Sequence, residues 1–203
     1  MRVYIIDAVA TLSDPKRARL SAPERILRAT AYRIVQSGAV ALTMQEVAEE
    51  AEVSKGLIHY HFHDKDTLLA RLVEWMVAHL VQRERDALAH STPRSALDDL
   101  WMWVAGELER GHVRVLIELG EWRSDLVHRA SKSAARMRRE ASAATLERLF
   151  GMLELRARVP AALVADVVVA FVDGLAISTG TDGERNPRPA FDVFWLSLLS
   201  LAE

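Results

Sequence analysis

The sequence of 203 residues contains no cysteine, and it has only nine glycines and six prolines. Aromatic residues are also sparse, at 6% of the chain. Without cysteine there is no disulfide framework, no thiolate metal site and no cysteine nucleophile. An excess of one charge is also missing, because the formal net charge is -2, so overall basicity gives no indication of nucleic-acid binding. Half of the residues are hydrophobic, which predicts a folded chain with a substantial core.

Long uncharged apolar runs are missing too. The nearest candidate for a membrane span, residues 161–178, is interrupted by Asp166 and Asp173. At the N-terminus the apolar run after Arg2 stops at Asp7 and is too short for a signal peptide. We therefore expect a cytoplasmic protein with no membrane partner.

The spacings that identify common enzymes are missing as well. The sequence has no Gly-rich phosphate loop, no His-Glu-x-x-His and no nucleophile elbow. The acidic pair Asp98-Asp99 stands near an expected helix start, where it complements the helix dipole. We expect no enzymatic activity, no catalytic residues and no cofactor.

What is present is helical periodicity over nearly the whole chain, with no alternating strand pattern. Polar caps and turn residues divide it into about nine helices, so the predicted fold class is all-α. The expected helices cover residues 21–37, 43–51, 54–62, 64–89, 94–109, 112–120, 124–156, 161–179 and 189–202. Residues 1–20 show no sustained periodicity and are expected to form a tail; alternatively Lys16, Arg17 and Arg19 lie against DNA.

The most informative segment is residues 43–65. Thr43 and Glu46 have the spacing of a capping box at the start of a short helix. Glu52 then lies at the corner, and Ser54 is placed to cap a second short helix. Two short capped helices joined by a tight turn describe a helix-turn-helix, whose second helix enters the DNA major groove.

Val-Ser-Lys-Gly-Leu-Ile-His-Tyr-His-Phe at 53–62, with Asp-Lys-Asp-Thr-Leu-Leu at 64–69 and Ile-Leu-Arg-Ala at 26–29, resembles the DNA-binding domain of the TetR family of transcriptional regulators. The resemblance covers roughly residues 22–75, about a quarter of the chain. One departure is Glu52, where the family usually has glycine. A left-handed or strained backbone is therefore expected at Glu52.

The resemblance implies an N-terminal three-helix DNA-binding domain joined by a long helix to a C-terminal helical domain. The implied parts are a tail at 1–20, the helix-turn-helix domain at 21–67 and a ligand-sensing and dimerisation domain at 68–203. The implied function is a DNA-binding transcriptional regulator, above all a repressor released from its operator by a small-molecule effector. Whether the regulator represses or activates transcription stays open. The alternative is a helical protein-interaction module that has lost operator binding, which Glu52 and the acidic residues around the motif favour.

Carried onto this sequence, the family motif implies a set of contacts with double-stranded operator DNA. Gln45 has the geometry for adenine, and Lys55 suits a guanine edge or a phosphate. Lys65 starts the long helix, where free amides also favour a phosphate. Leu57 either contacts a thymine methyl or belongs to the core. The expected DNA-binding residues are Thr43, Met44, Gln45, Ser54, Lys55, Gly56, Leu57, His59, Tyr60, His61 and Lys65.

His59, His61 and His63 also suggest a metal site. On a helix, His59 and His63 lie one turn apart, but His61 points elsewhere. No carboxylate or cysteine partner stands at ligand spacing. We therefore expect no bound metal.

The C-terminal segments combine many large apolar side chains with a few polar ones, as an effector pocket does. The same mixture also fits an ordinary core, and it leaves open whether the effector is cationic, neutral or acidic. The residues expected to contact the effector are Trp101, Trp103, His112, Glu118, Trp122 and Met137.

Segments 161–179 and 189–202 are apolar on more than one face. A helix that is apolar all round must be buried all round. The resemblance implies that these helices form a homodimer through a four-helix bundle, which would set two reading heads about 34–36 Å apart. The residues expected at this interface are Val164, Val168, Phe171, Phe194, Trp195 and Leu198.

Overall fold

The computed structural model describes residues 20–181, 186–200 and 202. These ranges contain nine α-helices and no strand, which confirms the all-α prediction; an isolated bridge joins Ala157 and Ala202. The helices are α1 (Ala22–Ala41), α2 (Met44–Ala51), α3 (Lys55–Phe62), α4 (Lys65–Ala87), α5 (Ala96–Arg110), α6 (His112–Gly120), α7 (Asp125–Met152), α8 (Ala161–Thr181) and α9 (Arg188–Leu199). The predicted roles of Lys16, Arg17 and Arg19 and of the N-terminal apolar run fall outside the described residues.

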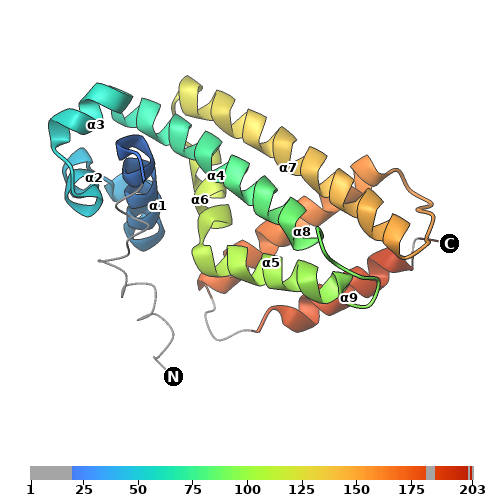
Figure 1. Ribbon diagram of the computed structural model, residues 1–203. Coiled ribbons are helices and arrows are strands. Elements are labelled where there is room, and N and C mark those ends of the chain that lie inside the picture. The colour runs from blue at the N-terminus through green and yellow to red at the C-terminus, as the bar shows by residue number, and fades with distance from the viewer. Residues whose placement is uncertain (1–19, 182–185, 201, 203) are drawn as a thin grey trace.

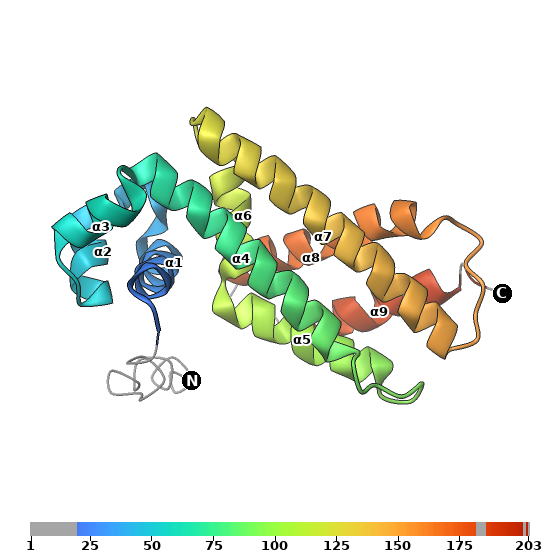
Figure 2. The same cartoon turned by 45° about the horizontal axis from the view of Figure 1, so that its top comes forward.

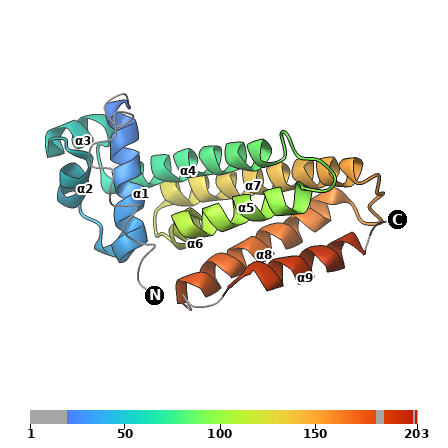
Figure 3. The same cartoon turned by 60° about the horizontal axis from the view of Figure 1, so that its bottom comes forward.

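The helices form a small head and a larger body. Figure 1 shows α1, α2 and α3 clustered at one end of the molecule, with α4 leaving this head and running alongside α7. Figure 2 shows the same pairing of α4 and α7 from a second direction. In Figure 3, α8 and α9 lie together on one side of the layer formed by α4, α5 and α7. One helix, α4, therefore belongs to both parts.

Polar caps start the helices of the head, as the sequence predicts. Thr43 and Glu46 form the complete capping box on α2. At each of the four helix starts a side-chain oxygen of the capping residue accepts a hydrogen bond from the backbone N–H three residues later. The pairs are Ser21 with Glu24, Thr43 with Glu46, Ser54 with Leu57, and Asp64 with Thr67. The apolar sides of these helices meet in a small core that includes Ile26, Ile34, Val47, Ile58, Phe62 and Leu68. Local capping and burial of one face together fix the angle between α2 and α3.

Two backbone positions shape the head. The first helix was expected to end at residue 37; Gly38, with φ 80°, does break the regular geometry of α1 there, but the helix resumes and continues to Ala41. Glu52 has φ 53° and ψ 50°, the left-handed conformation expected at the motif corner. Its N–H donates to the carbonyls of Ala48 and Glu49 and so closes α2.

The head is joined to the body through α6 as well as α4. Glu118 of α6 accepts a hydrogen bond from the N–H of Ala39 at 2.6 Å, just beyond the Gly38 break. Arg114 of α6 donates to the carbonyl of Val35 at 3.1 Å. The C-terminal turns of α1 are therefore held by side chains from the body.

Among the described residues, α8 contains one stretch, Ala161–Gly180, that is long and apolar enough to cross a membrane, with mean hydropathy 2.0. About a third of it is buried inside the chain (33%), because one side packs on α7. Asp173, within this stretch, forms an ion pair with Arg138 of α7. The core of the body therefore accounts for one face of α8 and leaves the other open.

Candidate DNA interface and effector cavity

The outer face of α2 and α3 carries exposed polar side chains at the end of the molecule farthest from the body (Figure 1). Tyr60 is 75% exposed, and Gln45, Lys55 and His59 are also exposed. The ammonium group of Lys55 makes no ion pair within the described ranges. The backbone at Gly56 is open, because the nearest atom to a Cβ placed there would be the Ser54 hydroxyl oxygen at 3.9 Å. This face has the donors and the open backbone that groove contacts require.

The acidic side chains of the motif are partly occupied. Glu46 accepts hydrogen bonds from the N–H of Thr43 at 3.0 Å and from Arg33 at 2.8 Å. Hydrogen bonds from Thr43, then Arg33, hold the pKa of Glu46 below its ordinary value. The amide of Gln45 donates to Glu49 at 2.8 Å, so Gln45 must leave this bond to read a base. Thr43 and Ser54 are exposed but also serve as caps.

Four of the predicted contact residues are less available. Lys65 donates to the carbonyl of Leu42 at 2.7 Å and lies 5.1 Å from the centre of the Trp122 ring, and burial lowers its pKa. In this structure Lys65 ties the start of α4 to the end of α1, and a phosphate contact by Lys65 stays a prediction. Met44, Leu57 and His61 are only partly exposed, and Met44 packs against the core.

The histidines of α3 interact with their neighbours. His59 Nδ1 lies 2.8 Å from the carbonyl oxygen of His63, and the rings of His61 and Tyr60 meet edge to face at 5.1 Å. In the described part of the chain no three His, Asp or Glu side chains are grouped so as to hold a metal ion.

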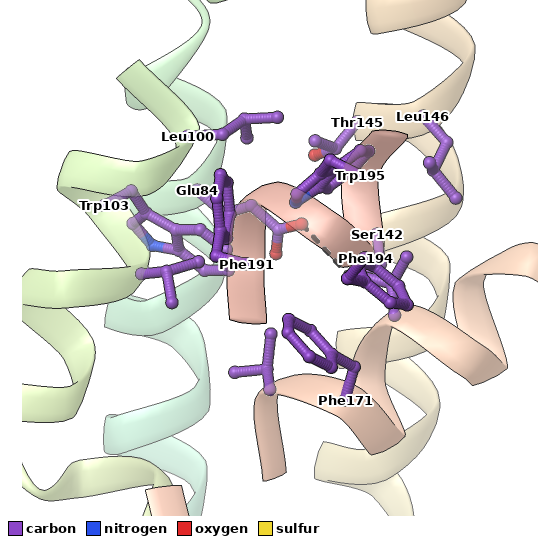
Figure 4. A pocket seen from close by; sticks show the side chains of 13 residues that line it. Glu84, Leu100, Trp103, Ser142, Thr145, Leu146, Phe171, Phe191, Phe194 and Trp195 are labelled. Carbon is purple, nitrogen blue, oxygen red and sulfur yellow. Dashed lines mark hydrogen bonds between the residues drawn. The ribbon is translucent and has the colours of Figure 1, made fainter. Parts of the chain in front are cut away.

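Inside the body, side chains from α4, α5, α7, α8 and α9 enclose a cavity, shown in Figure 4. About 350 Å³ is free of protein atoms there, mostly in gaps too narrow for water. Its lining consists of Glu84, Leu100, Trp103, Val104, Ser142, Thr145, Leu146, Val168, Phe171, Val172, Phe191, Phe194 and Trp195. A ligand must therefore displace side chains on entry.

Glu84 is the one ionisable residue in this lining. It is 2% exposed, and the hydroxyl of Ser142 donates to its carboxylate at 3.2 Å. Burial raises the pKa of Glu84 to about 7, against the lowering effect of hydrogen bonds from Thr145 and Ser142. No Arg, Lys or His nitrogen of the described residues lies within ion-pair distance of this carboxylate.

The neighbouring buried charges, by contrast, are paired. Arg138 donates to both oxygens of Asp173, at 2.5 and 3.3 Å. Arg83 donates to both oxygens of Glu107, at 2.5 and 2.8 Å. Glu84 therefore has no ion pair of its own, and Arg138, which is bound to Asp173, acts on it only as a nearby charge that lowers its pKa.

Aromatic rings form much of the cavity wall. Phe171 and Phe194 are stacked with centroids 4.0 Å apart, and Trp195 lies 5.8 Å from Phe194 and 5.9 Å from Phe191. Figure 4 shows the Glu84 carboxylate between Trp103 on one side and Trp195 and Phe194 on the other. The cavity therefore combines one acidic group with extended π surfaces.

Of the predicted effector residues, only Trp103 lines this cavity. Trp101 packs against Phe191 at 5.2 Å behind the wall, and His112 lies near Trp75, with its pKa lowered to about 4 by burial. The remaining three are elsewhere: Glu118 binds Ala39, Trp122 donates to Asp66 at 3.0 Å, and Met137 is 37% exposed. The sequence identifies large side chains but not the direction in which each helix presents them.

Glu84 was not among the residues predicted to contact an effector. Glu84 lies one helical turn after Leu80 and two turns after Val77, so it is on the buried side of α4. This spacing was the available signal. Ser142, Thr145 and Phe191 carried no comparable signal, because nothing local distinguishes them from ordinary core residues.

The predicted dimer residues also need correction. Val164, Val168, Trp195 and Leu198 are at most 7% exposed and belong to the chain's own core, and Phe171 and Phe194 line the cavity. Both helices are apolar on two sides, and the prediction chose the inner one. The outer apolar residues are Leu163, Val167 and Ile177 of α8 and Val193 and Leu196 of α9, which are 50% to 66% exposed.

Comparison with known proteins agrees with this architecture. The sequence pattern described as bacterial regulatory proteins, tetR family, matches residues 26–72. The chain is 25% identical to the HTH-type transcriptional regulator BetI of Serratia proteamaculans over 170 residues, 79% of this chain and 81% of that protein. It is 33% identical to BetI of Paraburkholderia phytofirmans over 75 residues, 36% and 38% of the two chains.

Solved structures share the fold. A transcriptional regulator from Rhodococcus sp. superposes with a TM-score of 0.72 at 22% identity, over 90% of this chain and 98% of that one. Reduced NemR of E. coli gives a TM-score of 0.70 at 17% identity, over 87% and 97%. The capped helix-turn-helix, the helical body and these similarities define a DNA-binding transcriptional regulator. The match to the tetR family of bacterial regulatory proteins covers most of the head and the first turns of α4, residues 26–72.

Proposed function

We propose that the protein is a repressor whose operator binding is relieved by a small molecule in the Glu84 cavity. The observation that carries this proposal is the course of α4, which begins in the head at Lys65 and supplies Glu84 to the cavity wall. A ligand that displaces the wall moves α4 and with it the head. It shifts the equilibrium only as far as it binds the released state better than the bound one.

Operator contact is assigned to the exposed outer face of the head. Lys55 and Tyr60 are the main proposed contacts, and Gln45 and His59 are further side-chain contacts. The hydroxyl groups of Thr43 and Ser54 and the backbone at Gly56 complete the proposed set. Residues 21–67 act as the reading head, residues 68–203 as the sensing and dimerising body, and the protein works in the cytoplasm beside its operator.

The dimer is proposed to form through the outer faces of α8 and α9. Leu163, Val167 and Ile177, with Val193 and Leu196, leave an exposed apolar surface on neighbouring helices. Two-fold symmetry around this surface buries it in both copies and places two heads on one side of a DNA duplex.

Binding to the DNA that flanks its own gene tests the regulator role. Fluorescence anisotropy at two salt concentrations, with a random-sequence duplex for comparison, should give sequence-selective affinity that falls steeply as salt rises. The double variant Lys55→Ala/Tyr60→Ala should lose this affinity. Arg136→Ala, which removes an exposed cation from α7, is the matched control and should retain it. Equal weak binding to both duplexes would instead favour a protein-interaction module.

A further inference from the structure

We propose that the Glu84 cavity selects a compact organic cation, a quaternary ammonium or protonated amine that carries an apolar group. This inference rests on the proposed role of the cavity as the effector site and adds the charge and shape of its ligand.

The first argument is the balance of charge in the cavity. Glu84 is buried without a cation, and no Lys, Arg or His is among the lining residues. The nearby Arg138 is engaged by Asp173, and Arg85, on the same helix as Glu84, is exposed. A buried carboxylate is costly when it has no cationic partner, so a ligand that brings the missing charge gains affinity. An anionic ligand would meet repulsion at the same position.

The second argument is the chemistry of the walls. The rings of Trp103 and Trp195, with those of Phe171, Phe191 and Phe194, line the cavity that holds the carboxylate and give it walls of ring edges and faces. Such faces attract organic cations by the ring quadrupole, most strongly where water is excluded. They also bury methyl or ring groups, which a metal ion or a simple hydrated cation does not offer. Together, one carboxylate and five aromatic rings favour an alkylated or aryl-substituted ammonium group.

The size of the cavity limits the ligand. Of the space of about 350 Å³ that is free of protein atoms, only about 10 Å³ is wide enough for water, which is far below the size of a ligand pocket. Because most of the space lies in narrow gaps, aromatic side chains must separate for a ligand to fit. A head group with one small apolar substituent therefore suits the site better than a large polycyclic molecule.

The test compares two probes of almost equal shape, phenyltrimethylammonium and its neutral carbon isostere tert-butylbenzene. Isothermal titration calorimetry on the full chain should show at least about tenfold tighter binding of the cation. Glu84→Gln should remove this preference and leave the affinity for the neutral probe unchanged. Glu84→Asp, which keeps the charge, should retain a preference. Glu74→Gln removes an exposed carboxylate from the same helix and should change neither affinity.

The outcomes separate this inference from the proposed function. Equal affinities for the two probes, no binding of the cation, or a cation preference that survives Glu84→Gln would overturn the cation proposal. Release of operator DNA is measured in parallel by anisotropy. Tight, Glu84-dependent binding of the cation without release would support the cation site while contradicting its role as effector site. Circular dichroism melting of each variant shows that it is folded.

Discussion

The head and the body of this protein are stabilised in different ways. In the head, the core is apolar, and the one buried polar side chain among its described residues, Thr30, donates to the carbonyl of Ile26 at 2.7 Å. The body instead buries Glu84, Glu107 and Arg138 together with two hydroxyl groups. An apolar core holds one geometry over a wide range of conditions, whereas buried charges make stability depend on what neutralises them. We therefore expect the stability of the body to depend more strongly on pH and on bound charges than that of the head.

The strongest test of the head is the pair Ile58 and Tyr60, two residues apart on α3. Ile58 is fully buried and Tyr60 is 75% exposed. Ile58→Ala should lower the free energy of unfolding by about 4 kcal/mol, because it leaves a cavity in a small core. Tyr60→Ala should change it by less than about 0.5 kcal/mol and should weaken operator binding instead. Urea denaturation and anisotropy measure the two effects, and a large loss of stability in Tyr60→Ala would contradict the division of roles.

In the body the matching test uses two aspartates on α8. Asp173→Asn leaves Arg138 buried without its countercharge and should cost about 3 kcal/mol. Asp166→Asn removes a partner of Arg139 at 3.5 Å, but that pair is exposed, and the change should stay within about 0.5 kcal/mol. Thermal unfolding of the two variants gives the comparison. Similar losses of stability in the two variants would mean that burial does not determine how much these ion pairs stabilise the fold.

The head could be predicted from sequence because its signals are local. The caps at Thr43, Ser54 and Asp64, the break at Gly38 and the left-handed corner at Glu52 each depend on residues within one helical turn. Lys65 is the exception. Its contact with Leu42 spans 23 positions, so no local pattern reveals it.

The body was predicted only as a set of helices. The boundaries of α8 and α9 are close to those expected, yet every predicted dimer residue lies on their inner side or in the cavity wall. When a helix is apolar all round, its periodicity no longer identifies which face meets which neighbour. The ends of α7 and α9 also come earlier than expected, at Met152 and Leu199, and a left-handed Glu154 follows α7.

The raised pKa of Glu84 gives the next prediction. The folded state holds the proton more tightly than the unfolded state, since the carboxyl pKa is about 7 rather than 4.5. Protonation of Glu84 therefore stabilises the folded state at low pH, and this stabilisation is lost as the pH rises through 7. The stability of the native chain relative to Glu84→Gln should therefore fall by about 2 kcal/mol between pH 5 and 7.5. Denaturation at several pH values measures this difference. The titration of His112 also affects stability, but His112 is present in both proteins, so its effect cancels in the difference. A flat difference would mean that Glu84 titrates normally.

The smallest expected effect concerns Glu52, which together with His63 is one of two non-glycine residues in the head with a positive φ. A left-handed backbone costs an L-residue about 1–2 kcal/mol, and glycine avoids this cost. Glycine also makes the unfolded chain more flexible, which offsets about 0.4–1 kcal/mol. Glu52→Gly should therefore raise the free energy of unfolding by about 0.5 kcal/mol, measured by urea denaturation, with operator affinity unchanged. Glu52→Ala keeps the strain and should bring no gain; stabilisation by alanine as well would show that the carboxylate, rather than the backbone, is the unfavourable feature of this turn.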